Sequence, residues 1–186
     1  MDEEKKTRRR GRRAYLDDFR RNVSGEYIYI GPLHAFQGTA ESRKRGLIRW
    51  GLMAVGMAAL GIVGGCIYAP GTTHCAYIMI PYVAGLLASW SVLWAFARLA
   101  RGGDPLRGYV YDATVSQFRL RTMITAVGAG CAVAGELVYV ALHGVQGMLP
   151  GMLLFLGSQG AMLALALLWR PLGREMVWEL RENPDR

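Results

Sequence analysis

Charged side chains are missing from four long stretches of this 186-residue chain. Residues 50–69, 76–97 and 148–169 contain no Asp, Glu, Lys or Arg, and residues 122–142 contain only Glu136. A soluble helical bundle needs a charged face opposite the apolar stripe of each helix. The strands of a membrane barrel need strict alternation of polar and apolar residues, which is also missing. Both of these fold classes are therefore excluded.

The sequence also lacks the motifs of common catalytic sites. It has no Walker loop, no G-x-G-x-x-G and no nucleophile elbow. The three Cys and three His do not have the spacing of zinc ligands. We therefore expect a protein that is not an enzyme and that holds no cofactor and no metal.

The four apolar stretches predict helices that cross a membrane. About 20 residues of helix span the roughly 30 Å of a bilayer core. The connections at residues 70–75 and 143–147 are short, so each pair of helices should form an antiparallel hairpin. The predicted fold is an all-α integral membrane protein, a four-transmembrane-helix bundle of two antiparallel hairpins, with spans at about 47–69, 76–97, 121–142 and 148–169.

The positions of the 22 Lys and Arg predict the orientation. Thirteen precede the first span, five lie between the second and third spans, and four follow the last. The two remaining connections contain none. Because positive residues concentrate in short cytoplasmic segments, both termini should lie in the cytoplasm. We expect a multi-pass protein of a cell membrane, specifically the bacterial cytoplasmic membrane.

The chain divides into four parts. Residues 1–13 form a basic tail that we expect to be disordered, and 14–45 form a cytoplasmic juxtamembrane segment. Residues 46–172 hold the four spans, and 173–186 form a cytoplasmic tail. The net charge of +8 is better explained by topology and by anionic lipid headgroups than by nucleic acid. Residues 14–23 have the spacing of an amphipathic helix, with a solvated linker as the alternative.

Strand-like segments suggest a small cytoplasmic cap. Residues 26–30 are β-prone, and residues 175–180 alternate as a strand does. The residues Tyr27, Tyr29 and Phe36 recur as Tyr109, Tyr111 and Phe118, 82 positions later, which could mark a duplicated unit. An interfacial aromatic belt would explain the Tyr and Trp residues equally well.

Small residues are frequent inside the spans. In lipid, small residues let helix backbones approach closely, and this packing is a main source of helix association. Such faces can pack helices within one chain or between copies. The candidate helix-packing glycines are Gly61, Gly65, Gly128, Gly135, Gly157 and Gly160.

Glu136 is the one acidic residue inside a span. A carboxylate near the bilayer centre costs about 2.5–3.5 kcal/mol to insert, so Glu136 needs a partner or a proton. Tyr82, Ser158 and Gln159 lie at similar predicted depths and could form hydrogen bonds to it, and His143 shares its helix face. Glu136 is then either a proton or cation site or a structural side chain that forms a hydrogen bond between helices.

A four-span protein with one intramembrane glutamate is similar in architecture to the small multidrug resistance transporters. Those proteins are shorter, lack a comparable basic tail and carry the glutamate in their first span, so we do not assign the chain to that family. Separately, Cys66 and Cys75 border the first predicted hairpin turn and could form a disulfide in an oxidising exterior.

The sequence therefore favours a small non-enzymatic interaction or accessory subunit with a basic, aromatic cytoplasmic face. Its expected partners are a bilayer with anionic headgroups and either a second copy or another membrane protein. The alternative is a small transporter or channel subunit that uses Glu136 for proton or cation coupling.

Overall fold

The computed structural model describes residues 18–21, 25–72, 75–145, 147–173, 176–181 and 183. The predicted disordered tail at 1–13 lies outside these residues. The strands are β1 (Phe19–Arg21), β2 (Tyr27–Tyr29), β3 (Leu33–Phe36), β4 (Leu106–Arg107) and β5 (Trp178–Arg181). The helices are α2 (Ala40–Cys66), α3 (Ala76–Arg101), α4 (Gly108–Ala113), α5 (Val115–His143) and α6 (Leu149–Gly173).

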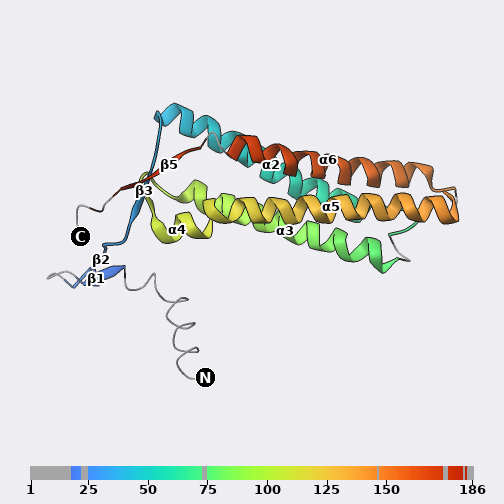
Figure 1. The fold of residues 1–186 in the computed structure, drawn as a ribbon, viewed down its shortest axis with the longest axis horizontal. Coiled ribbons are helices and arrows are strands. Elements are labelled where there is room, and N and C mark those ends of the chain that lie inside the picture. Colours follow the sequence, from blue (N-terminus) through green and yellow to red (C-terminus); the bar gives the residue numbers. More distant parts are fainter. Residues whose placement is uncertain are drawn as a thin grey trace, which may run out of the picture.

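Four long helices form an up-down-up-down bundle (Figure 1). Helix α2 packs against α3 and α6, and α5 packs against α3 and α6, so every neighbouring pair is antiparallel. Each of the four is long and apolar enough to cross a membrane, with the stretch from Gly108 to His143 counted as one. The predicted number and pairing of the long helices is therefore confirmed.

The helices extend beyond the apolar stretches that predicted them. Helix α2 begins at Ala40, where the Thr39 hydroxyl accepts a hydrogen bond from the Ser42 N–H at 3.2 Å. The first turns of α2 are polar, and the bundle core begins only at Trp50. At the other end of the molecule, α5 stops at Gly144, whose φ of 74° suits a residue without a Cβ.

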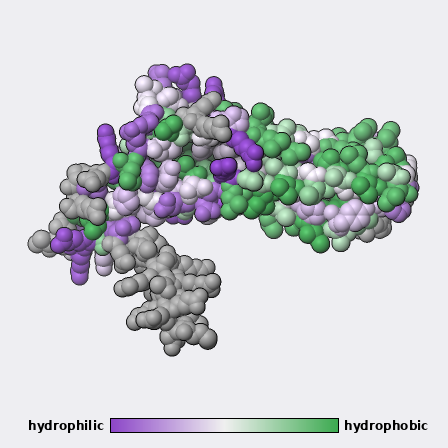
Figure 2. All heavy atoms as spheres, viewed as in Figure 1, coloured by the Kyte–Doolittle hydropathy of each residue, from purple (hydrophilic) through white to green (hydrophobic). Residues whose placement is uncertain are grey.

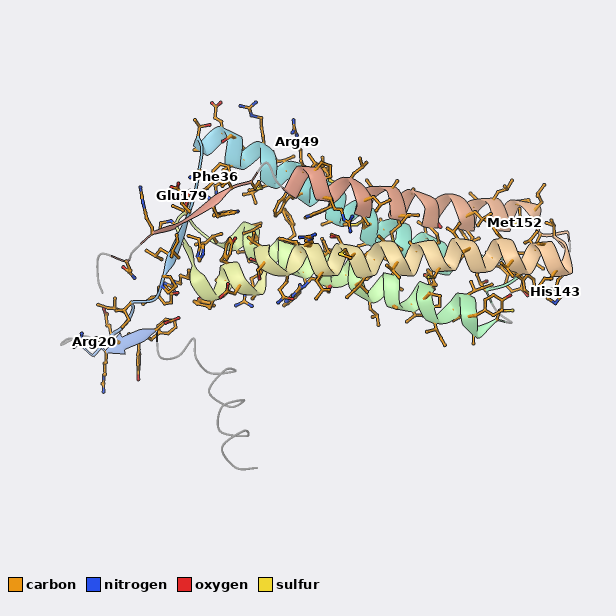
Figure 3. All side chains as sticks on the ribbon, in the orientation of Figure 1. Arg20, Phe36, Arg49, His143, Met152 and Glu179 are labelled. Atoms are coloured by element: carbon orange, nitrogen blue, oxygen red, sulfur yellow. The ribbon has the colours of Figure 1, made fainter. Side chains whose placement is uncertain are left out.

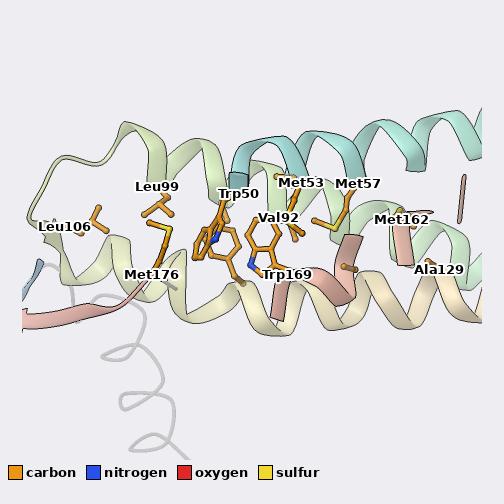
Figure 4. Packing of buried hydrophobic residues seen from close by; sticks show 14 residues of the cluster. Trp50, Met53, Met57, Val92, Leu99, Leu106, Ala129, Met162, Trp169 and Met176 are labelled. Carbon is orange, nitrogen blue, oxygen red and sulfur yellow. The ribbon is translucent and has the colours of Figure 1, made fainter. Parts of the chain in front are cut away.

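The larger cluster of buried hydrophobic side chains lies between the middle of the bundle and its cap end (Figure 4). The Trp50 ring centroid is 5.1 Å from the centroids of both Phe118 and Trp169. Met57 and Met162 fill the next layer and are fully buried. These side chains come from α2, α5 and α6, and together they fix how those helices pack.

A small sheet cap covers one end of the bundle. Strand β3 lies in the middle of a three-stranded sheet with β4 and β5 at its edges, all antiparallel. A separate antiparallel pair joins β1 and β2. Figure 3 shows Phe36 and Glu179 at this cap end and His143 and Met152 at the opposite end, which we call the turn end. The predicted cap is therefore present.

Two segments of the cap differ from what the sequence suggested. Residues 19–21 form strand β1 instead of part of an amphipathic helix over 14–23, because their backbone pairs with β2; residues 14–17, 22 and 23 lie outside the described part. Tyr109 and Tyr111 lie in helix α4, whereas Tyr27 and Tyr29 lie in strand β2. The repeated aromatic pattern therefore does not correspond to a repeated local structure.

Candidate functional site

Glu136 is fully buried near the turn end of α5. Its Oε1 accepts a hydrogen bond from the backbone N–H of Gly71 at 3.3 Å. A Cβ on Gly71 would lie 2.7 Å from Glu136 Oε2, so the turn rests directly on the carboxyl group. Oε2 has no hydrogen-bond partner among the described residues. Glu136 thus ties the α2–α3 turn to α5.

The three side chains that were expected around Glu136 gather elsewhere. Tyr82, Ser158 and Gln159 surround Gly64, where a Cβ would lie 3.1 Å from Ser158 Oγ and 3.4 Å from Tyr82 Cε2 and would collide with Gln159 Nε2. The predicted hydrogen bonds to Glu136 are not formed, because each side chain faces α2 or its own helix. The sequence did not identify the partners of these side chains.

The three side chains differ in their hydrogen-bond partners. Tyr82 Oη donates to the Gly61 carbonyl at 2.7 Å, which joins α3 to α2. Ser158 Oγ donates to the Phe155 carbonyl of its own helix at 2.8 Å. Gln159 is fully buried, and neither its Oε1 nor its Nε2 has a partner within the described ranges.

His143 lies apart from this buried group. It is exposed in the last turn of α5, its Nδ1 is 3.2 Å from the Tyr139 carbonyl oxygen, and its ring stacks on Tyr139 at 4.6 Å. Although both residues belong to α5, His143 is exposed whereas Glu136 is fully buried.

Four of the six candidate packing glycines lie in close contacts. Gly61 packs against Leu86 and Met162, and Gly65 lies directly under the Tyr82 hydroxyl. A Cβ on Gly128 would be 2.7 Å from the α3 backbone, and one on Gly135 would be 2.9 Å from Ile78 Cγ1. The remaining two, Gly157 and Gly160, have no atom within 4 Å of such a Cβ. They therefore do not pack helices within this chain.

The predicted disulfide between Cys66 and Cys75 is not formed, and both are free cysteines. The Tyr82 hydroxyl contacts the α2 backbone at Gly61 and Gly65, so the end of α2 lies level with Tyr82. Cys75 is seven residues before Tyr82, or about 10 Å further along α3. A disulfide requires Cα atoms within about 7 Å, which this offset prevents.

Aromatic side chains hold the cap on the bundle. His34 of β3 stacks on Tyr111 of α4 with ring centroids 3.9 Å apart, and Trp178 of β5 packs edge-on against Phe36 at 5.6 Å. Burial lowers the pKa of His34 below its ordinary value, and the nearby Asp112 carboxylate opposes this shift. The cap therefore favours a neutral His34.

Tyr29 of β2 links the two-stranded sheet to the start of α4 and to the residue before β3. Its hydroxyl accepts a hydrogen bond from the Gly108 N–H at 3.0 Å and donates to the Pro32 carbonyl at 3.1 Å. Burial raises the pKa of Tyr29, while the Gly108 bond acts in the opposite direction. Asn183 Nδ2 donates to the Tyr29 carbonyl at 2.6 Å, a contact that the sequence gave no sign of.

Basic side chains line two pockets at the cap end of the bundle. The first, of about 550 Å³, lies between α2 and α3 and is lined by Arg43, Lys44 and Asp104 together with apolar side chains. The second, of about 430 Å³, is lined by Arg98, Arg101 and Arg107. The sequence showed these arginines in one inter-span segment but not that they line one pocket.

The described side chains offer no evident metal site. No group of three or more His, Cys, Asp or Glu side chains within the described ranges is arranged to hold an ion.

Comparison of the chain with protein-family models, curated proteins and solved structures finds no match. The fold itself defines a class: a four-helix bundle whose helices are long and apolar enough to span a membrane, with a small sheet cap at one end.

Proposed function

We propose that the chain is a multi-pass membrane protein that acts as a non-enzymatic interaction or accessory subunit and presents its cap to the cytoplasm. The bundle surface supports membrane insertion. Each long helix exposes a large apolar side chain to its surroundings: Leu52 is 70%, Leu87 65%, Val127 62% and Leu154 61% exposed. Exposed apolar surface this extensive is costly in water and favourable in lipid.

The distribution of polar surface supports the orientation. Figure 2 shows hydrophilic side chains gathered around the cap end and a largely hydrophobic surface over the rest of the bundle. The turn end carries only the short connections after α2 and after α5. Since every Lys and Arg among the described residues lies in the half of the molecule that carries the cap, positive residues favour a cytoplasmic cap.

The cap is the surface that contacts a partner protein. It joins three distant segments of chain into one sheet, and its edge strand β5 leaves Leu180 69% exposed. A sheet edge with unpaired backbone groups can accept a strand from another protein. The turn end offers too little surface for such a partner, so the cap is the contact face.

Cysteine labelling tests insertion and orientation. In a variant without native cysteines, Thr72→Cys should react with a membrane-impermeant maleimide from outside intact cells. Glu179→Cys should react only after the membrane is opened. Labelling of residue 72 from the cytoplasmic side alone would reject the orientation, and loss of the protein from carbonate-washed membranes would reject insertion.

Crosslinking tests the contact face. A photo-crosslinking amino acid at Leu180 should give a discrete protein adduct in native membranes, with either a second copy or another membrane protein. The same amino acid at Leu154, on the lipid-facing side of α6, should give none. Equal protein adducts at both positions, or none at Leu180, would reject the cap as the contact face.

A second candidate function rests on the buried carboxyl of Glu136, whose Oε2 has no partner among the described residues. Intramembrane acids often bind protons or cations in transporters. In reconstituted vesicles, Glu136→Gln should then abolish proton-coupled or cation flux. Flux unchanged in this variant, or absent from the wild type, would leave Glu136 with the structural role described above.

A further inference from the structure

Three arginines surround one pocket where α3 ends and the chain turns into β4. Arg98, Arg101 and Arg107 line this pocket of about 430 Å³ together with Tyr109. None of their three guanidinium groups donates a hydrogen bond to, or forms an ion pair with, another described residue. The three arginines thus line a common space, and their mutual repulsion favours an anionic ligand.

The one acidic side chain in this turn faces the other way. Asp104 lies between the arginines in sequence, but its carboxylate accepts a hydrogen bond from the Phe36 N–H at 3.4 Å and lies 4.0 Å from Arg43 Nε. It therefore lines the pocket between α2 and α3 instead. The turn thus keeps Asp104 apart from the arginines, and the described residues that line the arginine pocket include no Asp or Glu.

Aromatic rings orient two of the three guanidinium groups. Arg98 lies over the Tyr109 ring at 5.9 Å, and Arg107 lies over the Tyr29 ring at 5.6 Å. A ring against the flat face of a guanidinium leaves the N–H groups at its edge free. Those N–H groups form the planar fork that binds two oxygens of a phosphate.

The pocket lies at the boundary between the apolar bundle and the polar cap. Trp94 precedes Arg98 by one helical turn on the same face of α3, and its side chain is 73% exposed. Exposed tryptophans favour the interface between lipid tails and headgroups. A phosphate held by the arginines would therefore lie at headgroup depth, with its acyl chains beside α3.

We propose that this pocket binds the phosphate of an anionic phospholipid from the cytoplasmic leaflet. The site rests on the proposed membrane insertion and orientation, and it adds a specific lipid to the general attraction between basic segments and anionic membranes. The phosphate group is the recognised chemistry. The position beside exposed apolar surface favours a lipid over a soluble phosphate.

The test uses the full-length protein in nanodiscs of phosphatidylcholine mixed with phosphatidylglycerol. Native mass spectrometry after partial delipidation should find phosphatidylglycerol retained on the wild type. The variant with Arg98→Gln, Arg101→Gln and Arg107→Gln should retain about tenfold less phosphatidylglycerol than the wild type, or even less. The control with Arg45→Gln, Arg119→Gln and Arg181→Gln, which removes the same charge at positions outside the pocket, should retain the lipid.

Arg101→Gln alone is the safeguard against misfolding of the triple variant, because Arg101 stacks on no described ring. It should reduce retention severalfold. Equal retention by pocket and control variants overturns the inference. Displacement of the lipid by millimolar inorganic phosphate also overturns it, because the ligand is then a free phosphate. Failure of the wild type to insert would instead reject the proposed function on which the inference rests.

Discussion

Helices α3 and α5 touch backbone to backbone where Gly85 meets Gly128. A Cβ on Gly128 would lie 2.7 Å from the Cα of Gly85 and 2.7 Å from the Pro81 carbonyl oxygen. Backbone atoms cannot move aside as the end of a flexible side chain can. This pair therefore sets the distance between the two helices.

Gly128→Ala should destabilise the bundle by about 1–3 kcal/mol, the usual cost of an overpacked core. Thermal unfolding in detergent would measure the change. Gly157→Ala is the matched control, because a Cβ there meets no atom within 4 Å, and it should cost nothing. If both variants unfold like the wild type, the close α3–α5 contact is wrong.

Glu136→Ala should destabilise the turn end by about 1–3 kcal/mol, because the buried Gly71 N–H loses its acceptor. Glu136→Gln keeps an Oε1 acceptor at this position and should remain close to the wild type. Hydrogen exchange of the Gly71 amide would report the change locally. Equal protection of this amide in the two variants would contradict the anchoring role of Glu136.

Tyr82→Phe should cost about 0.6 kcal/mol, and at most about 1.7, since it removes the hydrogen bond to the Gly61 carbonyl between α3 and α2. Unfolding in mixed micelles can resolve a change of this size. The control Tyr68→Phe removes a hydroxyl from a side chain that is 57% exposed. A larger loss in the control than in Tyr82→Phe would rule out this interhelical bond.

The cap should loosen in mild acid because burial lowers the pKa of His34. The folded cap then binds fewer protons than the unfolded segment, so its stability falls as the pH drops below about 6.5, the ordinary pKa of histidine. The ¹⁹F signal of fluorotryptophan at Trp178, which packs near His34 through Tyr111, should report this between pH 7.5 and 5.

The variant His34→Phe keeps a ring against Tyr111 but cannot take up a proton, so its Trp178 signal should not change over this range. The exposed His143 at the turn end serves as the control, and His143→Phe should respond to pH as the wild type does. Loss of the Trp178 signal in His34→Phe at pH 5 would assign the response to another group.

The long helices were predictable because their signal is local. Runs of uncharged residues such as 76–97 mark an apolar helix without reference to any other part of the chain. Helix ends were less predictable, since α2 continues from Ala40 through exposed polar residues that resemble a loop by composition. The short cap elements were the least predictable. Tyr109 and Tyr111 look like strand residues, yet their helix α4 packs under β3.

The sequence by itself determined four apolar helices, their antiparallel pairing, the segregation of every Lys and Arg, and the presence of one acidic residue in a span. Hydropathy and charge act at each residue independently, so they can be read along the chain. Only the tertiary structure decided that Glu136 bonds to Gly71, that Gly157 and Gly160 face outward, and that three arginines line one pocket. These facts depend on helix rotation and on contacts between residues distant in sequence, which no local pattern specifies.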